Sequence, residues 1–211
     1  RDWSSDVCSS DLCHEVEIGI MIELVPDFVG FVLIPKSRHF IAPEHAGYLR
    51  SKLRKNIKSV GVFSNASLQT VALSVETAGL DMVQLHGDET GEYIAALREY
   101  IKIPIMKVYK VKSPIDAERA MYSTADYVML DGGNVGDGKT FDWSLLGSVR
   151  RNFFLSGGLT PENFQKALSL TPQPYALNVS SGVEANRLKD YRKVMKFILG
   201  VKSFKQNKVQ I

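Results

Sequence analysis

The chain has 211 residues, of which 45% are hydrophobic and 23% are charged, which is enough for the core of one α/β domain. Its 26 lysines and arginines against 23 aspartates and glutamates give a formal charge of +3, spread along the chain, so the composition does not indicate a nucleic-acid partner. No segment approaches the roughly 18 continuous apolar residues that a membrane span needs, and no signal peptide is visible.

The N-terminal segment 1–12 differs from the rest of the chain. It is polar, rich in Ser and Asp, and shows neither the period of a strand nor that of a helix. It resembles translated sequencing-adapter sequence joined to a truncated reading frame, so we expect it to be non-native and the domain to begin at residue 13. Cys8 and Cys13 are too few and too close together for a disulfide framework or a zinc site, which predicts a reducing cytoplasm.

From residue 13 onward, short apolar runs alternate with segments of helical period. Ser67 and Gly79 predict the start and the end of one helix, and Thr160 with Pro161 predicts the start of another. The basic stretch 201–211 has little helical pattern and is expected to be a frayed tail. The expected strands are 27–33, 59–63, 82–85, 104–108, 126–130, 152–155 and 175–179, and the main expected helices are 15–24, 43–54, 67–78, 89–100, 114–122, 161–168 and 188–199.

This alternation predicts a parallel sheet with right-handed crossovers. Seven strand-then-helix units follow residue 26, and the helix at 15–24 has no strand of its own. Eight units of about 25 residues each make a (β/α)8 TIM barrel. We therefore predict such a barrel over residues 13–200, with the first strand replaced or degraded. An open doubly wound sheet is the alternative, but it needs a switch point and usually has fewer strands.

Two glycine and serine turns follow the last two expected strands. TIM barrels commonly bind phosphate between these two loops, through backbone N–H groups that glycine leaves accessible. One such turn is as compatible with a plain strand-to-helix connection, but two at adjacent strand ends favour phosphate binding. The predicted phosphate ligands are Gly157, Gly158, Ser180, Ser181 and Gly182.

Three further side chains follow strand ends. Asp131 is either a turn aspartate bonded to its own backbone or, partly desolvated at the barrel mouth, a proton donor. His86 is assigned to substrate positioning, although a lone histidine is more often a packed polar group. Arg38 lies in a cationic loop that is either solvated surface or a bidentate carboxylate site. Glu89, by contrast, is read as a first-turn helix residue that only favours the helix dipole.

Five motifs, in order and spacing, resemble phosphoribosylanthranilate isomerase. The resemblance implies an Amadori rearrangement of N-(5-phosphoribosyl)anthranilate to the carboxyphenylamino-deoxyribulose phosphate in tryptophan biosynthesis. It further implies that Asp131 protonates the ribose ring oxygen while a cysteine removes the C2 proton. No metal or organic cofactor is implied, because the substrate nitrogen is the electron sink. The motifs are 30–37, 83–89, 138–143, 155–163 and 179–184.

The chain also departs from the family pattern. The family cysteine lies on the first strand in a Lys-Ile-Cys-Gly type motif, and counting back places it at or near Ser10, two residues from Cys8. Cys8 is the candidate base if this segment forms a strand, and otherwise the base is lost. The family's Ser-Pro-Arg reads Ser37-Arg38-His39 here, which puts carboxylate binding in question, and Asn178 replaces an aspartate.

Two functions therefore remain open. The first is the isomerase, impaired by loss of the first-strand cysteine, and the second is a barrel that binds a sugar phosphate without turning it over. Indole-glycerol-phosphate synthase is disfavoured, since no matching lysine and glutamate set is found. In either case we expect a monomer or homodimer with a small-molecule ligand, phosphoribosylanthranilate for the isomerase, and no nucleic-acid or membrane partner.

Overall fold

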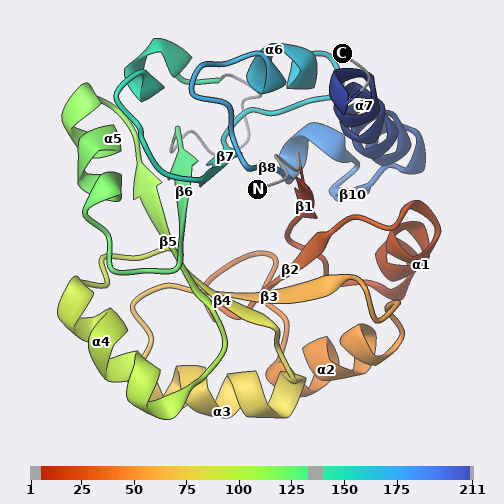
Figure 1. Cartoon of the computed structure of the whole chain (residues 1–211). Coiled ribbons are helices and arrows are strands. Elements are labelled where there is room, and N and C mark those ends of the chain that lie inside the picture. Colours follow the sequence, from red (N-terminus) through yellow and green to blue (C-terminus); the bar gives the residue numbers. More distant parts are fainter. Residues whose placement is uncertain (1–5, 133–139, 210–211) are drawn as a thin grey trace. The chain divides into compact units, whose positions relative to one another are not determined.

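The computed structural model describes residues 6–132 and 140–209, with side chains as far as residue 204. Its eight parallel strands neighbour one another in sequence order and form a closed barrel, as predicted (Figure 1). Helices alternate with the strands along the chain. The strands are β1 (Asp6–Ser9), β2 (Phe28–Val32), β3 (Lys58–Phe63), β4 (Met82–Leu85), β5 (Ile105–Lys110), β6 (Tyr127–Asp131), β7 (Phe153–Ser156) and β8 (Ala176–Val179).

The helices begin and end largely where the local signals predict. Ser67 Oγ accepts a hydrogen bond from Thr70 N at the start of α3, and Gly79 ends that helix with a φ of 62°. Among the helices in the described part of the chain, none is long and apolar enough to cross a membrane. The helices are α1 (Glu15–Leu24), α2 (Pro43–Ser51), α3 (Leu68–Ala78), α4 (Gly91–Tyr100), α5 (Pro114–Met121), α6 (Phe164–Leu168), α7 (Tyr191–Val209) and the 3-10 helices η1 (Trp143–Leu146) and η2 (Ser181–Val183).

The first strand comes from the segment that the sequence suggested is foreign. Residues 6–9 form β1, which pairs in parallel with β8, so that Cys8 stands opposite Asn178. Val7 and Cys8 are buried. The slot that the sequence left vacant is thus occupied, although residues 1–5 of the same segment lie outside the described residues.

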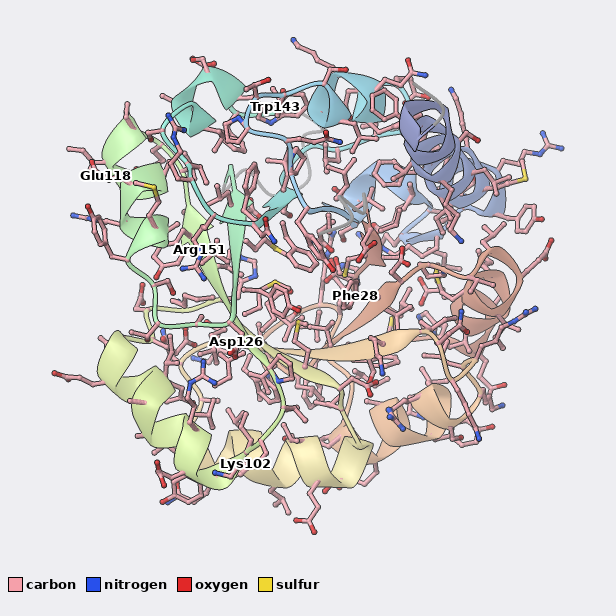
Figure 2. The ribbon with its side chains drawn as sticks, in the orientation of Figure 1. Phe28, Lys102, Glu118, Asp126, Trp143 and Arg151 are labelled. Atoms are coloured by element: carbon pink, nitrogen blue, oxygen red, sulfur yellow. The ribbon has the colours of Figure 1, made fainter. Side chains whose placement is uncertain are left out.

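The chain divides into two compact units. One comprises Arg1–Ser9, Tyr109–Tyr122 and Met129–Ile211, and it holds β7, β8 and β1 with α5, α6 and α7. In this unit α6 and α7 lie side by side, and the rings of Phe164 and Phe197 meet edge to face at 5.9 Å (Figure 1). In the same unit Arg151 Nη1 donates to Ala120 O on α5 at 3.2 Å (Figure 2).

The other unit comprises Ser10–Val108 and Ser123–Val128 and holds β2, β3 and β4 with α1 to α4. Two aspartates, each directly before a strand, accept hydrogen bonds from backbone amides near the start of the neighbouring strand. Asp81 Oδ2 accepts from Ser59 N at 2.9 Å, and Asp126 Oδ2 accepts from Ile105 N at 2.8 Å (Asp126 is labelled in Figure 2). These carboxylates therefore satisfy amides that would otherwise begin the strands unpaired.

Three expectations about the C-terminal part differ from the structure. Helix α6 begins at Phe164 rather than at Pro161, because Asn163 folds its side chain back onto the preceding turn and takes the N-cap position. The final helix begins at Tyr191 rather than Leu188, since Leu188–Lys189 forms β10 of a small antiparallel pair with β9 (Glu184–Ala185). Helix α7 then continues to Val209, through residues that the sequence suggested would form a frayed tail.

Candidate functional site

The two predicted phosphate turns pack against each other in the first unit. Gly157 and Gly158 follow β7 with φ angles of 95° and 69°, which side-chain-bearing residues rarely adopt. Gly182, after β8, lies directly on the carbonyl group of Leu159, where a Cβ has no room. Glycine at these positions is therefore required by the backbone as well as by the close approach of the two loops.

The carbonyl groups of these turns accept hydrogen bonds from neighbouring residues. The Gly158 carbonyl accepts from Asn163 Nδ2 at 2.8 Å, and the Ser180 carbonyl accepts from Val183 N at 3.3 Å. Within the described residues, no acceptor is found for the amides of Gly157, Gly158, Ser181 and Gly182. We call this group of amides the phosphate cup, because clustered N–H donors at glycine turns suit an anion.

Asp131 is the last residue of β6 and lies beside the phosphate cup. Its own carbonyl accepts from Val111 N at 2.8 Å, and the residue is half-buried. A Cβ added to Gly157 would stand 3.1 Å from Asp131 Oδ1, so the β7 turn touches the carboxylate. The structure thus brings the predicted acid and the predicted phosphate turn together in one unit.

Residues 140–146 contact the residue that follows β6. Residues 133–139, including Gly138-Lys139 of one motif, lie outside the described residues. Beyond them, Phe141 packs on Gly132, whose added Cβ would be 2.9 Å from Phe141 Cδ1. Trp143 (Figure 2) anchors η1 with a buried ring, and Asp142 Oδ1 caps this helix by accepting from Ser144 N at 2.9 Å. These bonds to Ser144 hold the pKa of Asp142 below its ordinary value.

The candidate base Cys8 is buried, with 1% of its surface exposed. It stands opposite Asn178 on β8, and Asn178 Nδ2 donates to Ser156 Oγ at 3.2 Å. Asn178 Oδ1 is a buried acceptor with no partner among the described residues. Cys8 therefore lies on β1, beside β8, the strand that leads into the turn at Ser180 to Gly182.

Arg38 and His86 lie in the second unit. Arg38 is exposed and its Nε donates to His39 Nε2 at 2.8 Å, which requires the neutral form of that ring nitrogen as acceptor. His86 follows β4, is half-buried, and is held by its backbone N donating to Phe63 O at 2.8 Å. Both residues are at the carboxyl ends of strands, as the sequence predicted.

The prediction for Glu89 was wrong. Glu89 lies before α4 and is buried, because it pairs with Lys107 of β5 at 2.9 Å, where both side chains are less than 10% exposed. Glu89 also accepts from Asn65 N at 2.7 Å and from Gly87 N at 3.0 Å. Through these contacts Glu89 stabilises the turn that follows His86. Asn163, which holds the Gly158 carbonyl, is a second residue whose role the sequence did not indicate.

Comparisons with known proteins agree with this geometry. Residues 10–199 match the family model for N-(5'-phosphoribosyl)anthranilate (PRA) isomerase. The chain is 40% identical over 190 residues to the isomerase of Acetivibrio thermocellus, covering 84% of this chain and 86% of that protein. The chain belongs to the phosphoribosylanthranilate isomerase family.

Two solved isomerase structures extend the likeness over nearly the whole chain. One is a phosphoribosylanthranilate isomerase in complex with reduced 1-(o-carboxyphenylamino)-1-deoxyribulose 5-phosphate, with a TM-score of 0.84, 33% identity and coverage of 94% of this chain and 99% of that one. The other is a set of monomers generated from the dimeric isomerase of Thermotoga maritima. Its TM-score is 0.84 at 34% identity, and the match covers 94% of this chain and 99% of that one.

The isomerase family match begins at Ser10, so Cys8 lies outside it. Asp11 has a φ of 68°, a left-handed conformation that glycine adopts without strain. The glycine of the Lys-Ile-Cys-Gly type motif would suit this backbone without strain. The assignment of the family cysteine to a position at or near Ser10 stays a prediction from the count along the sequence.

Proposed function

We propose that this chain carries the site for the Amadori rearrangement of N-(5-phosphoribosyl)anthranilate, with activity reduced by the serine at the cysteine position. The observation that carries the proposal is the contact between Gly157 and Asp131, which puts a carboxyl group beside the phosphate cup. The substrate's 5-phosphate would accept hydrogen bonds from the cup amides. Its ribose ring would then lie within reach of the carboxyl group.

Asp131 is the proposed general acid. It donates its proton to the ribose ring oxygen as the C1–O bond breaks, and the anilino nitrogen supplies the electron pair that forms the Schiff base. A base then removes the C2 proton, and the electron pair of that C–H bond moves toward the iminium nitrogen to give the enolamine. This enolamine tautomerises to the ketone, so no electrons are gained or lost overall.

The base is the defective part of the proposed site. We take the position of the family cysteine to be at or near Ser10, whose hydroxyl is a poor base without an activating partner. Cys8 carries a thiol two residues earlier, on β1, and we propose it as the residual base. Its burial argues for low turnover, since a base must reach the proton it removes.

Turnover of freshly prepared phosphoribosylanthranilate, followed by loss of its fluorescence, tests the proposal. We expect slow turnover that Asp131→Asn abolishes, and binding of the reduced product analogue that Asp131→Asn leaves within a fewfold. Turnover unaffected by Asp131→Asn would contradict the proposal. No turnover together with retained analogue binding would instead support the alternative, a barrel that only binds sugar phosphates, which the lost cysteine favours.

We further propose a monomer or a homodimer located in the cytoplasm. Neither Cys8 nor Cys13 forms a disulfide within the described residues, which suits a reducing compartment. The dimeric Thermotoga maritima relative that also exists as generated monomers supports either oligomeric state. Sedimentation of the purified chain distinguishes the two.

A further inference from the structure

A buried lysine lies behind the phosphate cup, in the antiparallel pair that the sequence did not predict. The side chain of Lys189 on β10 is 0% exposed, and its Nζ donates to Glu184 Oε1 at 2.8 Å and to the Ser180 carbonyl at 3.2 Å. A buried ammonium group is costly unless it is paired and hydrogen-bonded. Glu184 lies opposite Lys189 in the register of the pair, and the ammonium group also reaches the turn that follows β8, at the Ser180 carbonyl.

The carbonyl that Lys189 binds belongs to the peptide group that supplies one of the cup amides. The Ser180–Ser181 peptide is not among the cis bonds of the described chain, so its C=O and N–H point in opposite directions. A cation on the Ser180 oxygen therefore fixes the Ser181 N–H on the other side. Hydrogen bonds polarise one another along such a chain, which makes this N–H a stronger donor.

We propose that Lys189 is a positioning residue for phosphate binding, acting through the Ser180–Ser181 peptide and through its own charge. This inference rests on the proposed function, because it needs the cup to take a phosphate. Glu184 offsets the positive charge of Lys189. The ion pair therefore allows a buried lysine beside the Ser180 carbonyl, where its charge attracts an anion.

If Lys189 attracts phosphate through its charge, substitutions of the two members of the pair have opposite effects on binding. Lys189→Met removes the cation and weakens binding of inorganic phosphate and of the reduced product analogue by about tenfold. Glu184→Gln keeps an acceptor for Lys189 but removes the offsetting negative charge, and strengthens binding by about threefold. A purely structural role would weaken binding in both variants.

Titration calorimetry of the full chain tests this, with Lys196→Met as the control. Lys196 carries the same charge on α7 but pairs with Glu162 at the surface, so its variant should bind phosphate as the unchanged chain does. The NMR shift of the Ser181 amide on phosphate addition gives a second readout, which we expect to shrink in Lys189→Met.

The outcomes distinguish failure of the proposed function from failure of the proposed role of Lys189. No phosphate or analogue binding by the unchanged chain overturns the proposed function and this inference with it. Binding by the unchanged chain that Lys189→Met leaves intact overturns the inference alone. If Lys189→Met does not fold, weaker binding by Glu184→Gln overturns the inference, and tighter binding supports it.

Discussion

Gly157 lies beside the carboxyl group of Asp131, since a Cβ added to it would stand 3.1 Å from Asp131 Oδ1 and 2.7 Å from Gly132 N. The relationship links two features that the sequence shows 26 residues apart, a strand-end acid and a glycine turn. This proximity explains why residue 157 must be glycine. Its backbone has a positive φ, and a Cβ there would meet the Asp131 side chain.

Gly157→Ala should therefore impair both folding stability and ligand binding. The left-handed conformation costs an alanine about 1–2 kcal/mol, and the clash displaces either Asp131 or the cup amides. We expect at least a tenfold loss of affinity for the reduced product analogue, measured by calorimetry, alongside lower stability in urea.

Gly79→Ala is the matched control for this prediction. Gly79 has a φ of 62° at the end of α3 and an added Cβ would meet Arg50 only at 3.4 Å. This variant should lose similar stability and keep its affinity for the analogue. Equal affinity losses in the two variants would mean that the effect of Gly157→Ala reflects stability alone.

Restoring the cysteine and glycine of the family motif should raise turnover. In Ser10→Cys/Asp11→Gly, the thiol returns to the position where the family match begins, and glycine relieves the positive φ at Asp11. We expect turnover of phosphoribosylanthranilate to rise at least a hundredfold, the usual scale of a general base. Asp11→Gly by itself should stabilise the chain by about 0.5–1 kcal/mol without raising turnover.

Cys8→Ala serves as the control in both backgrounds. It should abolish the residual turnover of the unchanged chain and leave the restored double variant unaffected, since Ser10→Cys then supplies the base. A double variant no faster than the unchanged chain would show that the missing thiol is not the defect.

The barrel was predictable because each of its units repeats the same local pattern. Buried runs such as Met82–Leu85 and end signals such as Ser67 and Gly79 act through neighbouring residues, so the sequence displays them directly. The glycine turns after β7 and β8 were predictable for the same reason, because they are local features at the ends of strands. Phosphate binding by these turns and the role of Asp131 as an acid stay predictions, drawn from the fold and from the family resemblance.

Features that depend on distant partners were not predictable. Glu89 looks like a helix-start residue until Lys107, 18 positions later, is placed beside it. The pair β9–β10 consists of two-residue strands, too short to give a period. The strand β1 forms in sequence without strand character, because its neighbour β8 offers unpaired backbone groups and a buried position for Val7.

Acid should destabilise the chain partly through Asp81. Burial raises the pKa of Asp81, but hydrogen bonds from the Ser59 amide and hydroxyl outweigh it, and the nearby charges of Arg50 and Lys58 act in the same direction. The pKa of the folded state therefore lies below the ordinary value of 3.8. For a carboxyl group with a lowered pKa, the stabilisation is present above the unfolded-state pKa and is lost as the pH falls through the folded-state pKa.

The measurement is urea unfolding between pH 7 and pH 2.5, with Asp81→Asn as the comparison. We expect Asp81→Asn to cost about 1 kcal/mol at pH 7, a modest figure because the carboxylate is partly solvated, and the difference from the unchanged chain to shrink below about pH 4. A difference that stays constant down to pH 2.5 would show that protonation of Asp81 has no part in the acid response.

The buried pair of Lys107 and Glu89 should be far more sensitive than any surface pair. Lys107→Met leaves the Glu89 carboxylate buried without its cation, although the amides of Asn65 and Gly87 still bind it. Removing one partner of a buried pair typically costs about 3–5 kcal/mol. We expect a loss of this size in urea unfolding, together with weaker analogue binding, because the turn after His86 loses the bond from Lys107 Nζ to the Gly87 carbonyl.

Lys107→Met/Glu89→Gln should recover most of the lost stability, since the neutral amide oxygen still accepts from Asn65 N and no charge is left unpaired. Lys196→Met, which breaks an exposed pair with Glu162, should change stability by less than about 1 kcal/mol. The two lysines differ chiefly in burial, so equal losses in their single variants would contradict the role of desolvation. If the double variant is no more stable than Lys107→Met, the loss of stability comes from the missing hydrogen bond to Gly87 and not from the unpaired Glu89 carboxylate.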